Sequence, residues 1–224
     1  MVRARQLIAV LTLAALVLAA CASDPGPGRT ASPSEDRACD AAVQTVDLRV
    51  GSICGIEYSN QYDQRSHAYL GIPYARQPVA DLRWKAPEPL DSLEGNPFAA
   101  TKFGSECVQP SSELSGYSGS EECLFLNVYR PTDHTKTALP VMVWIPGGGF
   151  IVGSGSEPVM NGTALANQDV ILVAMNYRLG SLGFLRYQGN DTAIDGNFAI
   201  LDQQLAMQWV KDNIERFGGD PDQI

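Results

Sequence analysis

Residues 141–150, Val-Met-Val-Trp-Ile-Pro-Gly-Gly-Gly-Phe, constrain the fold more than any other stretch of the chain. The apolar run 141–145 is too short for a helix and predicts a buried strand, which Pro146 ends because proline cannot donate to a sheet. The three glycines that follow let the backbone turn sharply and approach a bound group. Backbone N–H groups displayed in this way can hold an oxyanion, although a tight turn that merely needs glycine is the alternative.

The composition is that of a globular protein. The chain has 224 residues, enough for one large domain or two small ones, with 45% hydrophobic and 18% charged residues. Its net charge of −9 argues against nucleic acid and against an anionic membrane surface as partners.

The N-terminus predicts export. Arg3 and Arg5 precede an uncharged apolar run, 7–20, that is short for a membrane-spanning helix, so residues 1–20 are interpreted as a signal peptide. The run ends Leu-Ala-Ala-Cys, which resembles the bacterial lipobox and predicts lipid attachment at Cys21; an ordinary signal with a chance cysteine is the alternative. Residues 21–38 would be a flexible tether. The expected location is the outer face of the bacterial cytoplasmic membrane.

Four further cysteines, Cys39, Cys54, Cys107 and Cys123, favour two disulfides in an exported protein, with three pairings possible. We expect the local pairing, Cys39–Cys54 and Cys107–Cys123. The second disulfide would close a loop of about 15 residues and stabilise the fold by roughly 3 kcal/mol. The absence of a C-x-x-C pair from the sequence and the presence of only two histidines argue against a zinc site.

Several short apolar runs predict strands, and one long segment predicts a helix. The expected strands are 43–50 and 53–59 around a Gly51-Ser52 turn, 68–72, 124–129, 141–145 and 170–175. Apolar residues at helical spacing predict a helix from Phe198 to Phe217, with Asn197 as its N-cap and Gly218-Gly219 as its stop. The pattern favours an α/β fold with a mostly parallel sheet behind an antiparallel start.

Six segments in order resemble the type-B carboxylesterases, the α/β-hydrolase group that includes cholinesterases and p-nitrobenzyl esterases. They are Gly-Ile-Pro-Tyr-Ala (71–75), Leu-Arg-Trp-Lys-Ala-Pro-Glu-Pro (82–89), Ser-Glu-Glu-Cys-Leu-Phe-Leu-Asn-Val (120–128), Trp-Ile-Pro-Gly-Gly-Gly-Phe (144–150), Asn-Tyr-Arg-Leu-Gly-Ser-Leu-Gly-Phe (176–184) and Gly-Asn (196–197) through Phe-Gly-Gly-Asp-Pro (217–221). The resemblance covers about residues 43–224. It implies that residues 39–224 are the N-terminal portion of an α/β-hydrolase domain.

The resemblance also implies roles for individual residues. The amides of Gly148 and Gly149 would form two arms of an oxyanion hole, and Cys107–Cys123 would be the family's first disulfide. Two pairs, Arg83 with Glu121 and Arg178 with Asp202, would be internal salt bridges. Pro146 departs from the histidine or tyrosine often found before these glycines, and we expect it to stiffen the loop.

The family's nucleophile sits in a G-x-S-x-G turn that follows the Phe-Gly-Gly-Asp-Pro stretch. No G-x-S-x-G occurs in the 224 residues, and neither His67 nor His134 matches the family's catalytic base.

The sequence therefore predicts a carboxylic ester hydrolase that acts through an acyl-enzyme and needs no metal or organic cofactor. This chain alone is expected to be inactive. A non-catalytic surface binding protein and a truncated product without function are the alternatives. We also expect an exposed apolar edge at strand 170–175 or at its neighbour.

Overall fold

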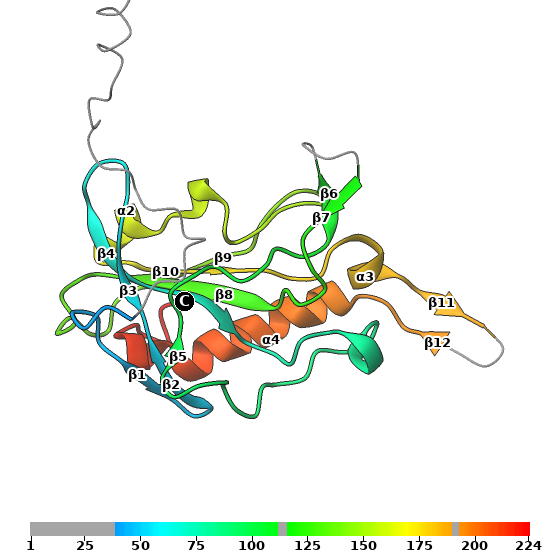
Figure 1. Cartoon of the computed structure of the whole chain (residues 1–224), viewed down its shortest axis with the longest axis horizontal. Helices are drawn as coiled ribbons and strands as arrows, with labels where there is room; N and C mark the ends of the chain where they lie inside the picture. Colours follow the sequence, from blue (N-terminus) through cyan, green and yellow to red (C-terminus); the bar gives the residue numbers. More distant parts are fainter. Residues whose placement is uncertain (1–38, 112–115, 190–192) are drawn as a thin grey trace, which may run out of the picture. The chain divides into compact units, whose positions relative to one another are not determined.

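A computed structural model of the chain describes residues 39–111, 116–189 and 193–224 (Figure 1). The predicted signal peptide, the lipid attachment at Cys21 and the tether 21–38 lie outside the described residues.

The centre of the described fold is a five-stranded sheet. Its order is β3 (Ile56–Ser59), β4 (Arg65–Pro73), β8 (Phe125–Arg130), β10 (Ile171–Met175) and β9 (Val141–Trp144). Three neighbouring pairs are antiparallel, and β9 runs parallel to β10. The antiparallel start is therefore confirmed, and β9 with β10 begins the parallel part.

A second, three-stranded sheet contains β1 (Val46–Leu48), β2 (Gly51–Cys54) and β5 (Phe98–Ala99). The predicted hairpin exists, but its turn lies before Gly51, because Leu48 pairs directly with Gly51. The predicted strand 53–59 is wrong as a single element. The chain leaves the small sheet at Cys54 and enters the central sheet at Ile56, so Gly55 separates two strands.

The predicted long helix is present as α4 (Phe198–Asn213), continued by η3 (Ile214–Phe217). Gly218, with φ +84°, ends it as expected. Asn197 is the N-cap residue, as predicted, but it has the left-handed conformation, φ +58°, and its side chain makes no capping hydrogen bond.

The remaining elements are short and lie in the connections. They are η1 (Ala80–Leu82), β6 (Gln109–Ser111), β7 (Gly116–Ser118), η2 (Pro158–Met160), α2 (Thr163–Ala166), α3 (Gly180–Phe184), β11 (Tyr187–Gln188) and β12 (Ala193–Ile194).

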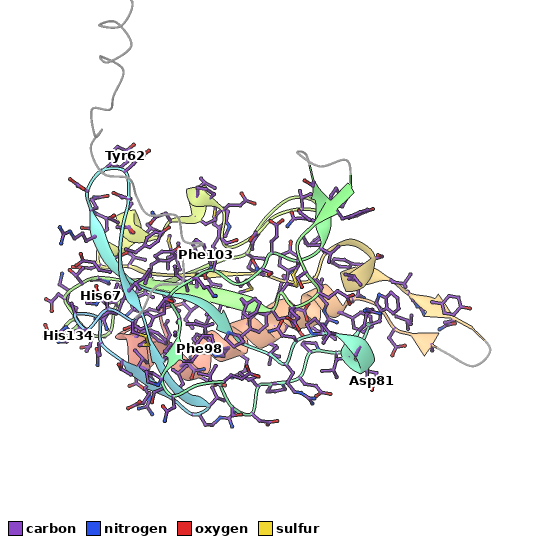
Figure 2. The ribbon with its side chains drawn as sticks, in the orientation of Figure 1. Tyr62, His67, Asp81, Phe98, Phe103 and His134 are labelled. Carbon is purple, nitrogen blue, oxygen red and sulfur yellow. A yellow bond between two sulfur atoms is a disulfide. The ribbon has the colours of Figure 1, made fainter. Side chains whose placement is uncertain are left out.

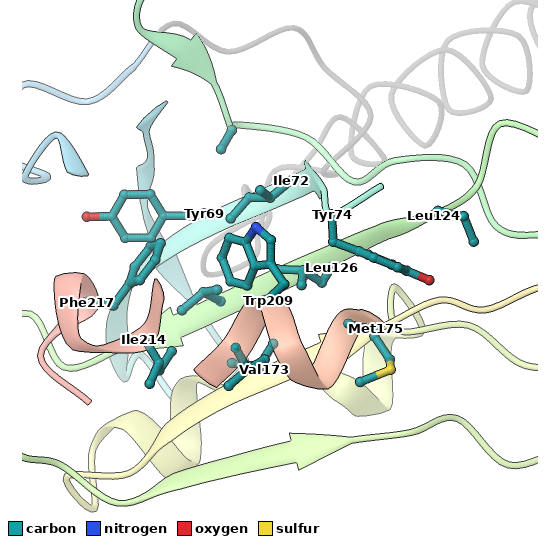
Figure 3. Close-up of a cluster of buried hydrophobic side chains, with 14 of the residues drawn as sticks. Tyr69, Ile72, Tyr74, Leu124, Leu126, Val173, Met175, Trp209, Ile214 and Phe217 are labelled. Carbon is teal, nitrogen blue, oxygen red and sulfur yellow. The ribbon is translucent and has the colours of Figure 1, made fainter. Parts of the chain in front are cut away.

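The inner strands β4, β8 and β10 are buried on both faces, which explains why β8 and β10 read as continuous apolar runs. On one face, Val173 and Met175 of β10 pack in the same cluster as Trp209 of α4 and Phe217 of η3 (Figure 3). On the other face, Leu172 packs with Tyr129, and Leu165 of α2 covers them. Successive side chains of β10 therefore enter different layers, as the pleat of a strand requires.

Strand β9 forms one edge of the central sheet. Its Val141 is buried, whereas Met142 is 54% exposed and Trp144 is 43% exposed. A groove of about 390 Å³ lies beside this edge, between Ile145 and the Ile200–Met207 side of α4. The expected apolar edge is therefore present at β9, the neighbour of the 170–175 strand, while β10 itself lies inside the sheet.

Candidate active site

The glycine loop, residues 146–157, begins where β9 ends. Tyr177, which follows β10, donates a hydrogen bond of 2.8 Å from its hydroxyl to the carbonyl oxygen of Pro146. Burial raises the pKa of Tyr177, so this hydroxyl remains a donor across the neutral pH range. The first residue of the loop is thus held to the strand next to β9.

Within the glycine loop the backbone turns back on itself. The carbonyl oxygen of Gly148 accepts hydrogen bonds from the amides of Ile151 at 3.1 Å and Val152 at 3.2 Å. Gly148 has φ +116°, and a Cβ added there would lie 2.1 Å from the carbonyl oxygen of Val152. Position 148 therefore requires glycine for both its backbone conformation and its space.

The turn leaves two donors unused. Within the described part of the chain, the structure records no hydrogen bond from the backbone N–H of Gly148 or of Gly149. Both residues are exposed. Two free amides next to each other, just beyond the carboxyl end of a strand, can donate to a single negatively charged oxygen.

Three buried side-chain amides contact residues 153–155, the returning arm of the glycine loop. Gln109 binds Gly153, while Asn127 and Asn176 both bind Gly155. No pattern in the sequence predicted a role for any of them. Asn127 and Asn176 belong to the quoted family segments and could have been singled out, whereas nothing in the sequence around Gln109 marks it.

The two predicted ion pairs are present in different surroundings. Arg178 and Asp202 are 3% and 0% exposed, and the Arg178 guanidinium donates to both carboxylate oxygens, at 2.8 and 2.6 Å. Burial raises the pKa of Asp202, while its hydrogen bonds from Arg178 act in the opposite direction. Arg83 and Glu121 also form a two-point contact, but their side chains are 41% and 27% exposed. The expectation of a buried pair thus fits only Arg178–Asp202.

Both disulfides have the predicted local pairing. Cys39 bonds to Cys54 and Cys107 bonds to Cys123. The second bond closes the segment that carries β6 and β7, so it lies close in sequence to Gln109.

The two histidines lie away from the glycine loop. His67 pairs across strands with Arg130, at the end of β8 opposite to the Leu126–Met175 pair that lies near the loop. His134 follows Arg130 in the chain, and Figure 2 shows both histidines at the same end of the sheet. Burial lowers the pKa of His67.

Among the described residues, no group of three or more histidine, cysteine or acidic side chains is placed to hold a metal ion. The same residues contain no helix that is long and apolar enough to cross a membrane.

Comparison with known proteins places this geometry in context. The sequence pattern of the carboxylesterase family matches residues 42–224. The para-nitrobenzyl esterase of Bacillus subtilis (strain 168) is 49% identical over 164 residues, which cover 70% of this chain and 33% of that protein. The cholinesterase of Mus musculus is 46% identical over 169 residues, covering 70% of this chain and 28% of that protein.

Solved structures give the same result. A thermophilic para-nitrobenzyl esterase superposes with a TM-score of 0.69 at 44% identity, over 80% of this chain and 37% of that one. A second para-nitrobenzyl esterase superposes with a TM-score of 0.68, also at 44% identity, covering 80% of this chain and 36% of that chain. The chain therefore has the α/β-hydrolase fold and spans about a third of the length of these relatives.

Proposed function

The chain belongs to the carboxylesterase family, and we propose that its glycine loop supplies the oxyanion hole of a serine carboxylic ester hydrolase. The observation that carries the proposal is the pair of unbonded amides at Gly148 and Gly149. Family membership supports ester substrates in general, and the proposal assigns no particular alcohol or acyl group.

The chemistry follows from where charge develops. When a nucleophile attacks an ester carbonyl, the carbonyl oxygen becomes an oxyanion, and two N–H donors already aimed at that point stabilise the tetrahedral intermediate. A serine would then carry the acyl group until water hydrolyses it, with a histidine moving the proton. The role assigned to this chain is the charge stabilisation by Gly148 and Gly149, and no residue of it is assigned to the serine or histidine role. We accordingly expect no ester turnover from the chain alone.

The decisive experiment compares two glycine variants in the complete product of the reading frame, using a p-nitrophenyl ester. Gly148→Ala places a Cβ against the carbonyl oxygen of Val152 and displaces the amides, so kcat should fall about 10²- to 10³-fold. Gly116→Ala is the matched control, because a Cβ there meets no atom of the described residues within 4 Å. It should leave kcat unchanged.

Two results would contradict the proposal. One is a Gly148→Ala variant that keeps its full rate. The other is a complete product without any G-x-S-x-G serine, which would favour the non-catalytic binding protein instead.

We also propose that the protein is exported and carries lipid at Cys21. The support is the apolar run 7–20 followed by Leu-Ala-Ala-Cys. Detergent phase separation of the protein made in a bacterial host should place the wild type in the detergent phase and Cys21→Ser in the aqueous phase. An intact mass without added lipid on the wild type would overturn this assignment.

A further inference from the structure

We propose that Gln109 is a positioning residue for the oxyanion hole, acting through the backbone of Gly153. The inference rests on the oxyanion role proposed above for Gly148 and Gly149. It adds a residue that makes no contact with the proposed oxyanion donors and lies almost 40 positions earlier in the chain.

The Gln109 side chain both accepts a hydrogen bond from the returning arm of the glycine loop and donates one to it. The amide of Gly153 donates to the Gln109 side-chain oxygen at 2.8 Å, and the Gln109 side-chain nitrogen donates back to the Gly153 carbonyl at 3.5 Å. The same nitrogen also donates to the Cys107 carbonyl at 3.2 Å. Gln109 is only 7% exposed, so little water competes for these groups.

Gly153 lies directly against Pro146 and Gly147, the outgoing arm of the glycine loop. A Cβ on Gly153 would be 2.3 Å from the carbonyl oxygen of Gly147, which shows how closely the two backbones approach. The Gly147 carbonyl belongs to the same peptide unit as the Gly148 amide. Because a peptide unit is planar, a shift of Gly153 that moves this carbonyl also reorients the amide.

A second attachment lies two residues further along, at Gly155. Its amide donates to the Asn176 side chain at 2.8 Å, and its carbonyl accepts from Asn127 at 3.1 Å. Asn127 also accepts from the Gly71 amide of β4, and Asn176 also donates to Ser105. Loss of either asparagine would therefore disturb other parts of the fold, whereas the recorded Gln109 bonds reach only Gly153 and its own segment.

This support matters because, among the described residues, no partner orients the two donor amides in the absence of substrate. An oxyanion hole works when its donors are held in place before the reaction, so that no reorganisation is needed as charge develops. Internal turn bonds to the Gly148 carbonyl fix the shape of the turn but not its position relative to the sheet. Tyr177 holds Pro146 and the two asparagines hold Gly155, and Gln109 adds an attachment at Gly153, which lies against the Gly147 carbonyl. It ties this point of the loop to the segment closed by the Cys107–Cys123 disulfide.

The first test measures hydrogen–deuterium exchange of the full chain by mass spectrometry. Gln109→Met keeps the length of the side chain and removes both bonds to Gly153, so the amides of residues 151–155 should exchange at least about tenfold faster. Gln77→Met is the matched control. Gln77 also accepts a backbone hydrogen bond, from Leu124 at 3.0 Å, and makes no recorded contact with the glycine loop.

The second test measures ester hydrolysis in the complete product of the reading frame. Gln109→Met should lower kcat about tenfold with KM within twofold, because only the transition-state contact is misplaced. Gln109→Glu can still accept from the Gly153 amide, so its kcat should fall less. Gln77→Met should keep the wild-type rate.

The proposal is overturned if Gln109→Met leaves exchange at 151–155 unchanged, or if Gln77→Met loosens the loop equally. It is also overturned if KM rises while kcat stays constant. A wild-type protein without esterase activity would instead refute the proposed function, and the exchange experiment would still decide whether Gln109 holds the loop.

Discussion

Two arginine–carboxylate pairs of the same chemistry occupy opposite surroundings in this protein. Arg178–Asp202 lies between the end of β10 and α4 and is almost fully buried, whereas Arg83–Glu121 lies at the rim and is open to water. Both are two-point contacts, so their geometry alone does not distinguish them. The difference teaches that the environment, and not the motif, decides how much each pair contributes to stability.

The strongest way to test the comparison is to break the buried pair. Asp202→Ala leaves the Arg178 guanidinium buried without its counter-charge, so the free energy of unfolding should fall by about 3–5 kcal/mol. Urea denaturation followed by circular dichroism measures this change. A loss below about 1 kcal/mol would show that the interior around Arg178 admits water.

The surroundings of the exposed Arg83–Glu121 pair can be tested through the Cys107–Cys123 disulfide. Glu121 lies inside the segment closed by Cys107–Cys123. We therefore expect this disulfide to stabilise the segment more than the ion pair does. Replacing both cysteines by serine should lower the free energy of unfolding by roughly 3 kcal/mol. The corresponding double replacement at Cys39 and Cys54 serves as the comparison, because that disulfide closes a loop of similar length.

The interior can also be tested without disturbing an ion pair. Burial raises the pKa of Tyr69 to about 12, against about 10 for a free tyrosine. Between pH 10 and pH 12, Tyr69 loses its hydroxyl proton more readily in the unfolded chain than in the folded protein. The contribution of Tyr69 to stability is therefore fully present below pH 10 and declines as the pH rises to 12. The loss attributable to Tyr69 should be about 2–3 kcal/mol.

Denaturant titrations at pH 9 and pH 12 check this decline. Tyr69→Phe should show a smaller loss than the wild type, because it keeps the edge-to-face ring contact with Phe217 and has no proton to lose. An equal loss in both proteins would assign the pH dependence to other groups.

The smallest effect is expected at the exposed pair. Glu121→Gln should change the urea midpoint far less than Asp202→Ala does, because water already solvates the Arg83 guanidinium. Added salt should abolish whatever difference remains. A salt-independent loss as large as that of Asp202→Ala would end the distinction between the two pairs.

The sequence predicted the elements that bury continuous apolar runs. The strands β8, β9 and β10 lie within a residue or two of the predicted ranges, and the long helix is α4 continued by η3, because these patterns reflect burial directly. It failed at Gly55, and at Asn197 it found the N-cap position but not the backbone conformation. Whether one strand continues or divides between two sheets depends on its neighbours in space, and a capping residue at the right position can still adopt a left-handed backbone.

The candidate site also contains residues that the sequence could identify and one that it could not. Gly148 and Gly149 could be singled out because the Trp-Ile-Pro-Gly-Gly-Gly-Phe segment resembles the corresponding segment of the carboxylesterases. Gln109 could not, because its partner is the backbone of Gly153, and a backbone group has no identity in the sequence. The contact also joins residues that lie 44 positions apart in the chain.

During synthesis, strand β9 is made before the C-terminal residues with which its first residues pair. Its first amide, that of Val141, donates to the carbonyl of Gln223, and the Leu139 backbone pairs with Gly219. Ribosomes add about 5–20 residues per second, and about 80 residues separate Val141 from Gln223, so Val141 waits roughly 4–16 s for this partner. We expect the speed of translation across this interval to set how long the exposed apolar strand is available to chaperones or to other nascent chains.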